Sequence, residues 1–454
     1  MTGSFSWRAW RGSAAVALVV IGAAFTGCSL DSDGTGRPST TTGTGGAGGT
    51  GGAVNTGGGG GAGGEGGAGG EAGAGGTGGG EPAPLAAWDA SEPDLAMGSY
   101  TLPDWLVFES PSDGKTSQIG PDMLRTGFGP DEPRARSVDG STWGLSVEGE
   151  RTNRAQASHY QAGIWQEFNA TISMSTGPDG IDVATLIADE TSAAQGALIV
   201  SFTPELNAES TVSAWVTTSA SNAVNTSLEC NTFPAQQSTR LVSPGTGWHR
   251  ASITGAESVA AASLVRFRPV VGGNPEVGSA SIDLVSVETG LYPSSVIITH
   301  PVDNPAPATR MAERLYTPTA GDLAPGGYFH AVLVFAPHYA AGEQSSAHDL
   351  LVFDDQHRVY VRQDSAVVLQ QEGTDVLFTA PLDWERDQEL TVEVLSQPGS
   401  RRLRVTGAAG GEAVVEDGGG PAFPIEEPLY VLGGAAGSQE GADLRAITFH
   451  APPM

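Results

Sequence analysis

Basic residues are scarce in this chain of 454 residues. Lysine and arginine together number 22 against 51 aspartates and glutamates, the formal net charge is −29, and Lys115 is the only lysine. Nucleic acids and anionic lipid headgroups bind basic surfaces, so this charge balance argues against both as partners. We therefore expect no nucleic acid partner, although the charge does not say what the partner is.

Cysteine is nearly absent, because the chain has only Cys28 and Cys230. Cys230 stands in an alternating run, 225–232, on the same face as Leu228, so we expect it to be a small buried side chain rather than a nucleophile. The absence of other cysteines excludes a disulfide framework if Cys28 is used elsewhere.

Long apolar runs are also rare, and the one that matters lies at residues 13–26, after Arg8 and Arg11. Its length suits a secretory signal and is too short for a stable membrane-spanning helix. The run ends in Phe25-Thr26-Gly27-Cys28, which resembles the lipobox of bacterial lipoproteins, with Phe25 in place of the usual aliphatic residue. The resemblance implies a signal peptide over 1–27 and acylation of Cys28.

Glycine is concentrated rather than spread, since 24 of the 65 glycines lie in residues 43–80. That tract has no strict third-residue period, which excludes collagen. Residues 28–84 cannot bury a core, and we expect a disordered tether with a reach on the order of 40 Å. Ser29 is not the aspartate that commonly retains lipoproteins at the inner membrane. We therefore expect an exported protein, lipid-anchored to the bacterial cell envelope and displayed at the outer membrane surface.

Helix signals are scarce after residue 85, where short alternating runs separated by glycine, proline, asparagine and aspartate predominate. This pattern predicts an all-β chain with two consecutive β-sandwich domains. Nine strand-like runs lie between residues 165 and 288, as in a jelly roll, and ten more lie between 328 and 450. The proline-rich passage 300–310 is the natural boundary between the two bodies.

The run Gly144-Leu145-Ser146-Val147-Glu148-Gly149-Glu150-Arg151-Thr152-Asn153 resembles the GLxxExxRTN motif of a domain family in phage-tail and bacterial surface proteins. Residues 177–189, 247–250, 281–295 and 308–313 resemble later passages of that family in the same order. The resemblance implies a carbohydrate-binding-module-like jelly roll over 150–295 and a concanavalin A- or laminin G-like sandwich over 296–454. We expect the lead-in, 85–149, to pack on the first sandwich.

Catalytic motifs are missing: the sequence has no HExxH, CxxC, G-x-S-x-G or P-loop pattern. The tightest carboxylate group is 385–389, where Glu385, Asp387 and Glu389 would share one face of a strand, as in retaining glycosidases. The intervening Arg386 and Gln388 do not suit a core-facing strand, so a solvated acidic loop is the better interpretation. We expect no catalytic residue and no cofactor, while the acidic turns would permit a structural Ca²⁺.

A binding surface is better supported. The strand-like run 211–218 places Trp215 opposite the apolar face, and Arg266 and Arg268 similarly point outward, as do Glu229 and Asn231. An aromatic platform beside fixed polar groups is typical of a sugar site. The alternative is that residues 86–143 cover Trp215.

Three functions remain open. The first is a surface-tethered, non-catalytic lipoprotein that binds a glycan or another surface polymer. The second is a structural or adhesion component whose sandwiches pack on protein partners. The third is a glycoside hydrolase that uses Glu385 and Glu389 on a concanavalin-like fold.

The lipid anchor gives the first testable prediction. Cys28→Ala removes the only acylation position of the proposed lipobox, so the protein should leave the membrane fraction for the soluble fraction. Fractionation followed by immunoblotting measures this, and an unchanged distribution would contradict the lipoprotein interpretation.

Overall fold

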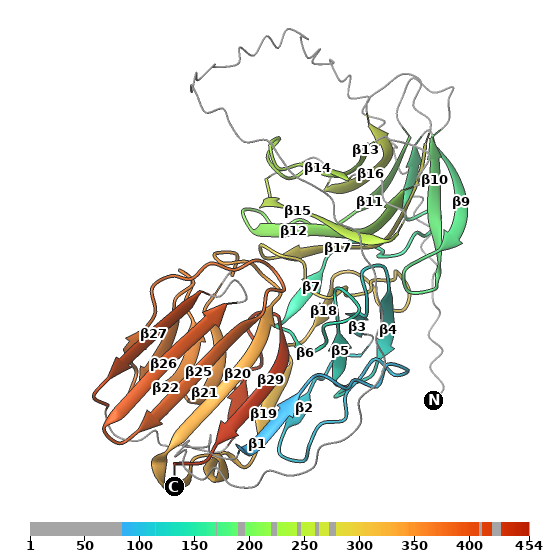
Figure 1. The fold of residues 1–454 in the computed structure, drawn as a ribbon. Helices are drawn as coiled ribbons and strands as arrows, with labels where there is room; N and C mark the ends of the chain where they lie inside the picture. Colours follow the sequence, from blue (N-terminus) through green and yellow to red (C-terminus); the bar gives the residue numbers. More distant parts are fainter. Residues whose placement is uncertain are drawn as a thin grey trace, which may run out of the picture. The chain divides into compact units, whose positions relative to one another are not determined.

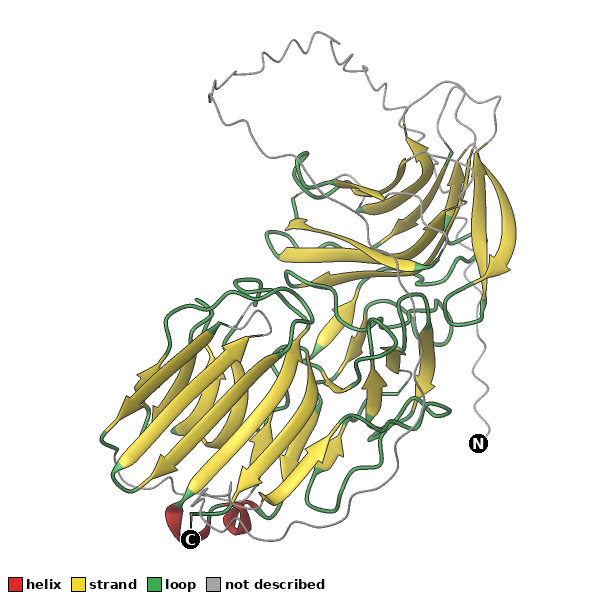
Figure 2. Ribbon diagram, viewed as in Figure 1, coloured by secondary structure: helices red, strands yellow, loops and turns green. Residues whose placement is uncertain are grey.

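The structure is a computed structural model that describes residues 84–453 apart from 114, 169, 189–195, 219–224, 243–246, 259–262, 272–277, 345, 408–410 and 420–427. Strands dominate this part of the chain (Figure 2), and two 3₁₀ turns, Ala320–Leu323 and Pro325–Gly327, accompany them. No helix in it has the length and apolarity needed to span a bilayer. The predictions for the signal peptide, Cys28 and the tether lie outside the described residues.

The first sandwich consists of two five-stranded antiparallel sheets. One sheet has the order β15-β12-β17-β10-β9, and the other has the order β14-β13-β16-β11-β8 (Figure 1). Their bounds are β8 Gln166–Phe168, β9 Ala170–Thr176, β10 Asp182–Ala188, β11 Ala197–Ser201, β12 Glu209–Thr218, β13 Asn225–Cys230, β14 Thr239–Val242, β15 His249–Ala256, β16 Leu264–Val271 and β17 Gly278–Thr289. Alternate side chains of both sheets, Cys230 among them, fill the core between them. The predicted runs over 165–288 are thus confirmed as strands.

The second sandwich pairs an eight-stranded sheet, β27-β26-β25-β20-β29-β6-β5 with β1 also on β29, with a seven-stranded sheet, β2-β19-β28-β21-β22-β23-β24. Its later strands are β19 Arg314–Thr317, β20 Phe329–Pro337, β21 His348–Asp354, β22 His357–Val361, β23 Val367–Gln371, β24 Thr374–Phe378, β25 Leu390–Gln397, β26 Ser400–Gly407, β27 Glu412–Asp417, β28 Leu429–Val431 and β29 Ala442–His450. Strictly alternating burial along β25 reflects one face on the core and one toward solvent. The all-β sandwich prediction is confirmed.

The lead-in corrects the sequence prediction, because most of its strands complete the second sandwich rather than pack on the first. Its strands are β1 Pro84–Asp89, β2 Val107–Glu109, β3 Lys115–Gln118, β4 Leu124–Phe128, β5 Arg134–Arg136 and β6 Gly144–Val147. β1 and β6 follow one another along the same edge of β29, and β2 pairs with β19. These strands pair there because the edge of β29 would otherwise present unpaired backbone groups. The fully buried Leu145 of β6 also adds to the core of the second sandwich. The first sandwich is therefore inserted between the lead-in and the rest of the second sandwich.

A buried ionic network, which we call the joint, lies where the insertion begins and ends. Arg134 Nη2 of β5 lies 3.0 Å from Glu148 Oε2 and 2.7 Å from Glu313 Oε2, and all three side chains are fully buried. Arg310 Nη1 lies 3.0 Å from Glu148 Oε2, and the Ser295 backbone N–H donates to Glu148 Oε1 at 2.8 Å. Burial alone would raise the pKa of Glu148, but Arg310 and Arg134 hold it well below its ordinary value.

Asn153 fixes the first residues of the insertion to its last ones. It ends β7, Arg151–Asn153, which pairs with β18, Ala308–Arg310. Its amide nitrogen donates to the carbonyls of Val285 and Ile297 at 3.2 and 2.7 Å, and its amide oxygen accepts the N–H of Val287 at 3.0 Å. The residues that resemble the family motif thus hold the two sandwiches together.

Breaking the joint should destabilise the fold strongly. Arg134→Met leaves the buried carboxylates of Glu148 and Glu313 without their shared partner, so the free energy of unfolding should fall by about 3–5 kcal/mol. Chemical denaturation measures the change. Arg362→Ala removes the exposed pair with Asp364, at 2.7 Å, and should cost less than about 1 kcal/mol. Equal effects of the two substitutions would contradict the importance of the joint.

Candidate functional site

A cavity of about 790 Å³, which we call the cleft, opens beside β7. Both sandwiches contribute to it, since β7, the loops around β12 and the turn after β17 meet Gln344 and Gln363 there. The lining residues are Glu150, Arg151, Thr152, Arg154, Thr203, Glu205, Ala208, Glu209, Thr289, Gly290, Leu291, Pro307, Gln344 and Gln363. Its volume falls in the range of about 300–1,000 Å³ typical of small-molecule sites.

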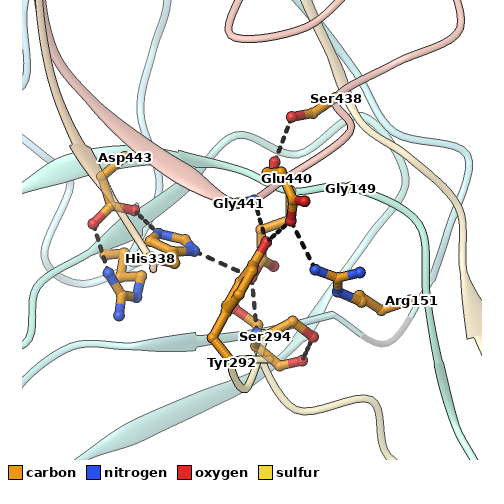
Figure 3. Close-up of polar contacts among 12 residues, drawn as sticks. Gly149, Arg151, Tyr292, Ser294, His338, Ser438, Glu440, Gly441 and Asp443 are labelled. Carbon is orange, nitrogen blue, oxygen red and sulfur yellow. Dashed lines mark hydrogen bonds and ion pairs between the residues drawn. The ribbon is translucent and has the colours of Figure 1, made fainter. Parts of the chain in front are cut away.

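Arg151 forms part of the cleft wall and is held from behind (Figure 3). Its Nη2 lies 2.9 Å from Glu440 Oε2, and its guanidinium carbon lies 4.9 Å from the centre of the Tyr292 ring. Tyr292 donates its hydroxyl proton to the same Glu440 oxygen at 2.5 Å. Gly290, with a φ of 125°, leaves room for the guanidinium, because a Cβ there would lie 3.3 Å from Arg151 Cζ. Arg151 is therefore fixed, with its charge balanced by Glu440.

Arg154 stands near the other end of β7 and is also paired. It forms an ion pair with Glu257, and it donates to Ser210 Oγ at 2.8 Å and to the Thr203 carbonyl at 3.0 Å. Its Nε is buried without a hydrogen-bond partner in the described structure. The two arginines thus give the cleft rigid walls but little net positive charge.

Gln344 contributes a buried amide side chain to the cleft wall. The side chain is 5% exposed, and its Nε2 donates to the carbonyl of Arg362. Its Oε1 is buried and accepts no hydrogen bond from the residues described. A buried acceptor without a donor costs about 1–3 kcal/mol, so a ligand that supplies a donor would recover free energy here.

Acidic side chains dominate the remaining charge of the cleft. Glu150, Glu205 and Glu209 line it, whereas Arg151 and Arg154 are each paired with a glutamate outside the lining set. Glu205 accepts the hydroxyl of Thr289 at 2.7 Å. The cleft therefore offers carboxylate, amide and hydroxyl groups for hydrogen bonding and disfavours anionic ligands.

Trp215 corrects the sequence prediction of an open aromatic platform. Its side chain does lie opposite Val212, Ala214 and Val216, as the alternation predicts, but it is 1% exposed. It packs in a small separate cluster with Leu124 of the lead-in. The alternative, a tryptophan covered by residues 86–143, is the correct one, because the β3–β4 hairpin lies over this face.

The other predicted ligand residues gather on the opposite sheet from Trp215. Arg266 Nη1 and Arg268 Nε of β16 lie 3.4 and 3.1 Å from the carboxylate of Glu229 on β13. Asn231 is committed to the backbone, since its Oδ1 accepts the N–H of Leu264 at 2.8 Å. The predicted sugar site, with Trp215 as a platform beside these residues, is therefore wrong, since Trp215 lies on one sheet and the polar residues lie on the other.

The acidic run at 385–389 forms the turn before β25, not a strand. Asp387 lies 2.7 Å from Arg136, and Arg386 lies 2.8 Å from Glu343. Glu385 and Glu389 are exposed. The loop interpretation is confirmed, and the three carboxylates do not share a strand face.

Two groups of one histidine and two aspartates could hold a metal ion in the described part of the chain. The first group is His338, Asp387 and Asp443. Arg136 Nη1 lies 2.7 Å from both of its aspartates, and His338 Nε2 lies 2.8 Å from Asp443. The guanidinium occupies the place between the carboxylates, so this group is already neutralised. The second group, His159, Asp179 and Asp283, contains no such arginine.

Comparisons with known proteins give distant structural neighbours only. No family model and no curated protein match the chain. Among solved structures, it resembles a tandem of carbohydrate-binding modules, CBM22-1 and CBM22-2, from Xyn10C of Paenibacillus barcinonensis, at 10% identity and a TM-score of 0.24, covering 67% of this chain and 99% of that one. It also resembles peanut lectin with a nine-residue peptide, at 7% identity and a TM-score of 0.17, covering 67% and 97%.

Sequence reasoning missed the cleft because its residues come from distant parts of the chain. The only available signal was the motif itself, in which Glu150, Arg151 and Thr152 follow one another. Gln344 carries no sequence signature, since its importance comes from an unpaired oxygen that only the packing creates.

Trp215 should be a stability residue. Trp215→Ala leaves a large cavity in the cluster with Leu124, so the free energy of unfolding should fall by about 3–5 kcal/mol, as measured by denaturation. Phe378→Ala, at a side chain that is 53% exposed, should cost less than about 1 kcal/mol. A stable Trp215→Ala protein would contradict the buried position.

Proposed function

We propose that this chain is a surface-tethered, non-catalytic lipoprotein that binds a glycan in the cleft. The observation that carries the proposal is the unpaired Gln344 Oε1 at the wall of a cavity large enough for a short oligosaccharide. Sugars present many hydroxyl donors, which an amide oxygen and carboxylates accept. A rigid polar cleft lowers the entropic cost of binding such a ligand.

The preferred ligand is a neutral glycan. Glu150, Glu205 and Glu209 would repel sulfated or uronic acid polymers, and the paired arginines do not offset them. Carboxylates are also suitable acceptors for neighbouring sugar hydroxyls. The absence of aromatic side chains among the described lining residues favours recognition by hydrogen bonds over stacking.

Binding without catalysis fits the position of the acidic residues. Glu385 and Glu389, the pair for a hydrolase, are exposed in a turn and are not among the residues that line the cleft. Retaining glycosidases need two carboxyl groups about 5–5.5 Å apart across one bond. The function therefore rests on recognition, with the tether through Cys28 placing the cleft outside the membrane.

Gln344→Leu gives the direct test. The substitution keeps roughly the size of the side chain and removes the Oε1 acceptor, together with the Nε2 donor to the Arg362 carbonyl. Affinity for a neutral oligosaccharide identified on a glycan array should therefore fall about tenfold by calorimetry. Gln356→Leu, at an exposed turn residue, is the matched control and should bind as the wild type does.

Three outcomes would overturn the proposal. Unchanged affinity of Gln344→Leu would remove the site, and binding restricted to anionic polymers would remove the ligand class. Release of reducing ends that disappears in Glu385→Gln would restore the hydrolase alternative.

A further inference from the structure

The histidine–aspartate group of the first sandwich is independent of the cleft. Asp179 lies in the turn between β9 and β10, Asp283 lies on the neighbouring strand β17, and His159 lies in the segment that precedes β8. One ligand atom from each residue lies within 4.8 Å of the others. Three elements distant in sequence thus converge on one point.

The two carboxylates are buried and incompletely bonded. The side chains of Asp179 and Asp283 are fully buried, while that of His159 is 19% exposed. His159 Nδ1 lies 2.8 Å from Asp283 Oδ1, and its Nε2 lies 3.8 Å from Asp179 Oδ2. The Oδ2 atoms of both aspartates have no hydrogen-bond partner among the residues described. Two unpaired acceptor oxygens therefore lie beside one imidazole.

The local backbone brings the carboxylates together. The Asp179 Oδ1 atom accepts the N–H of Ile181 at 3.0 Å, and the Gly177 N–H donates to the Ile181 carbonyl at 2.7 Å. A Cβ at Gly177 would lie 2.9 Å from Asp283 Oδ2 and 2.5 Å from a methyl carbon of Val183. Glycine is thus required for the turn to approach β17 this closely.

The charge of this group calls for a cation. Two buried carboxylates face a single imidazole, and among the described residues their ion pairs are with His159 alone. Buried charges without a partner are strongly unfavourable. The comparable group of His338, Asp387 and Asp443 resolves the same problem with Arg136, 2.7 Å from each carboxylate. In the His159 group, no arginine or lysine among the described residues pairs with the two carboxylates.

We propose that His159, Asp179 and Asp283 bind one divalent ion of the zinc class. One imidazole nitrogen and the two unpaired carboxylate oxygens form a three-ligand set, and a water completes a tetrahedron. The 3.8 Å between His159 Nε2 and Asp179 Oδ2 fits this pair of ligands, because two ligands each about 2.0–2.2 Å from one zinc lie within about 4.2 Å of each other. Asp283, whose Oδ1 lies 2.8 Å from His159 Nδ1, completes the set of three residues. An imidazole ligand favours zinc over Ca²⁺, which takes six to eight oxygens.

Metal titration of the untagged full chain tests the proposal. After treatment with EDTA, calorimetry with ZnCl₂ should show one ion bound per chain, and the Tm should rise by about 3–8 °C at saturating zinc. Co²⁺ in place of Zn²⁺ should give the visible absorption of a tetrahedral site. Binding of Ca²⁺ in preference to Zn²⁺, or of neither ion, would overturn the proposal.

Asp179→Asn and His159→Gln locate the ion. Each should abolish the zinc-dependent rise in Tm, while His300→Gln, which removes an exposed histidine 3.2 Å from Asp303, should keep it. Asp179→Asn also relieves the repulsion between carboxylates, so the metal-free variant should unfold at the same or a higher temperature than the metal-free wild type. Zinc binding by Asp179→Asn equal to that of the wild type would show that the ion binds elsewhere.

Discussion

The shared pairing of Arg134 with Glu148 and Glu313 is the constraint on which the rest of the structure depends. Each group comes from a different part of the chain, and each is fully buried. Buried charges tolerate the loss of a partner poorly, since removal of Arg134 leaves two buried carboxylates without the cation that they share in a low dielectric. The network therefore forms only when the lead-in, the motif and the second sandwich are all in place. It makes the insertion of the first sandwich conditional on the correct assembly of the second.

The position of the cleft follows from this joint. The chain leaves the network at Glu148 and reaches Arg151, the first residue of β7, within a few residues; there Glu440 of the second sandwich holds Arg151 in the cleft wall at 2.9 Å. Asn153 then binds the carbonyl of Ile297 at 2.7 Å, so the two ends of the insertion are fixed to each other. The cleft is thus rigid for the same reason that the fold is stable. Rigid polar walls favour selective binding because little ordering is left to the moment of association.

The sequence predicted the strands well and their partners poorly. Alternation depends on neighbouring residues, and it located the strands of the first sandwich and β20 to β29 of the second, but not β1, β2, β5, β6 and β19. The prediction placed the lead-in on the first sandwich, because β6 is only four residues long and its partner lies far away in the sequence. Leu145 pairs with Leu444, about three hundred residues away. The burial of Trp215 also depends on a distant segment. Alternation correctly turned its side chain away from the core of the first sandwich, and Leu124 of the lead-in covers it there. Local pattern decides orientation, whereas distant pairing decides exposure.

The two histidine–aspartate groups consist of the same residue types, so composition does not distinguish them. They differ in whether an arginine lies between the two carboxylates. Both place one imidazole beside two aspartates. Arg136 reaches one group from β5 at 2.7 Å and closes it with a fixed positive charge. Asp283 of the other group stands fully buried between Ile282 and Leu284 on β17, with an oxygen that receives no donor in the described structure. A carboxylate in a fully buried strand segment is costly unless something neutral or positive compensates it. Where the chain supplies no such group, an ion from solution is the simplest compensation, and the partial exposure of His159 gives it a path inward.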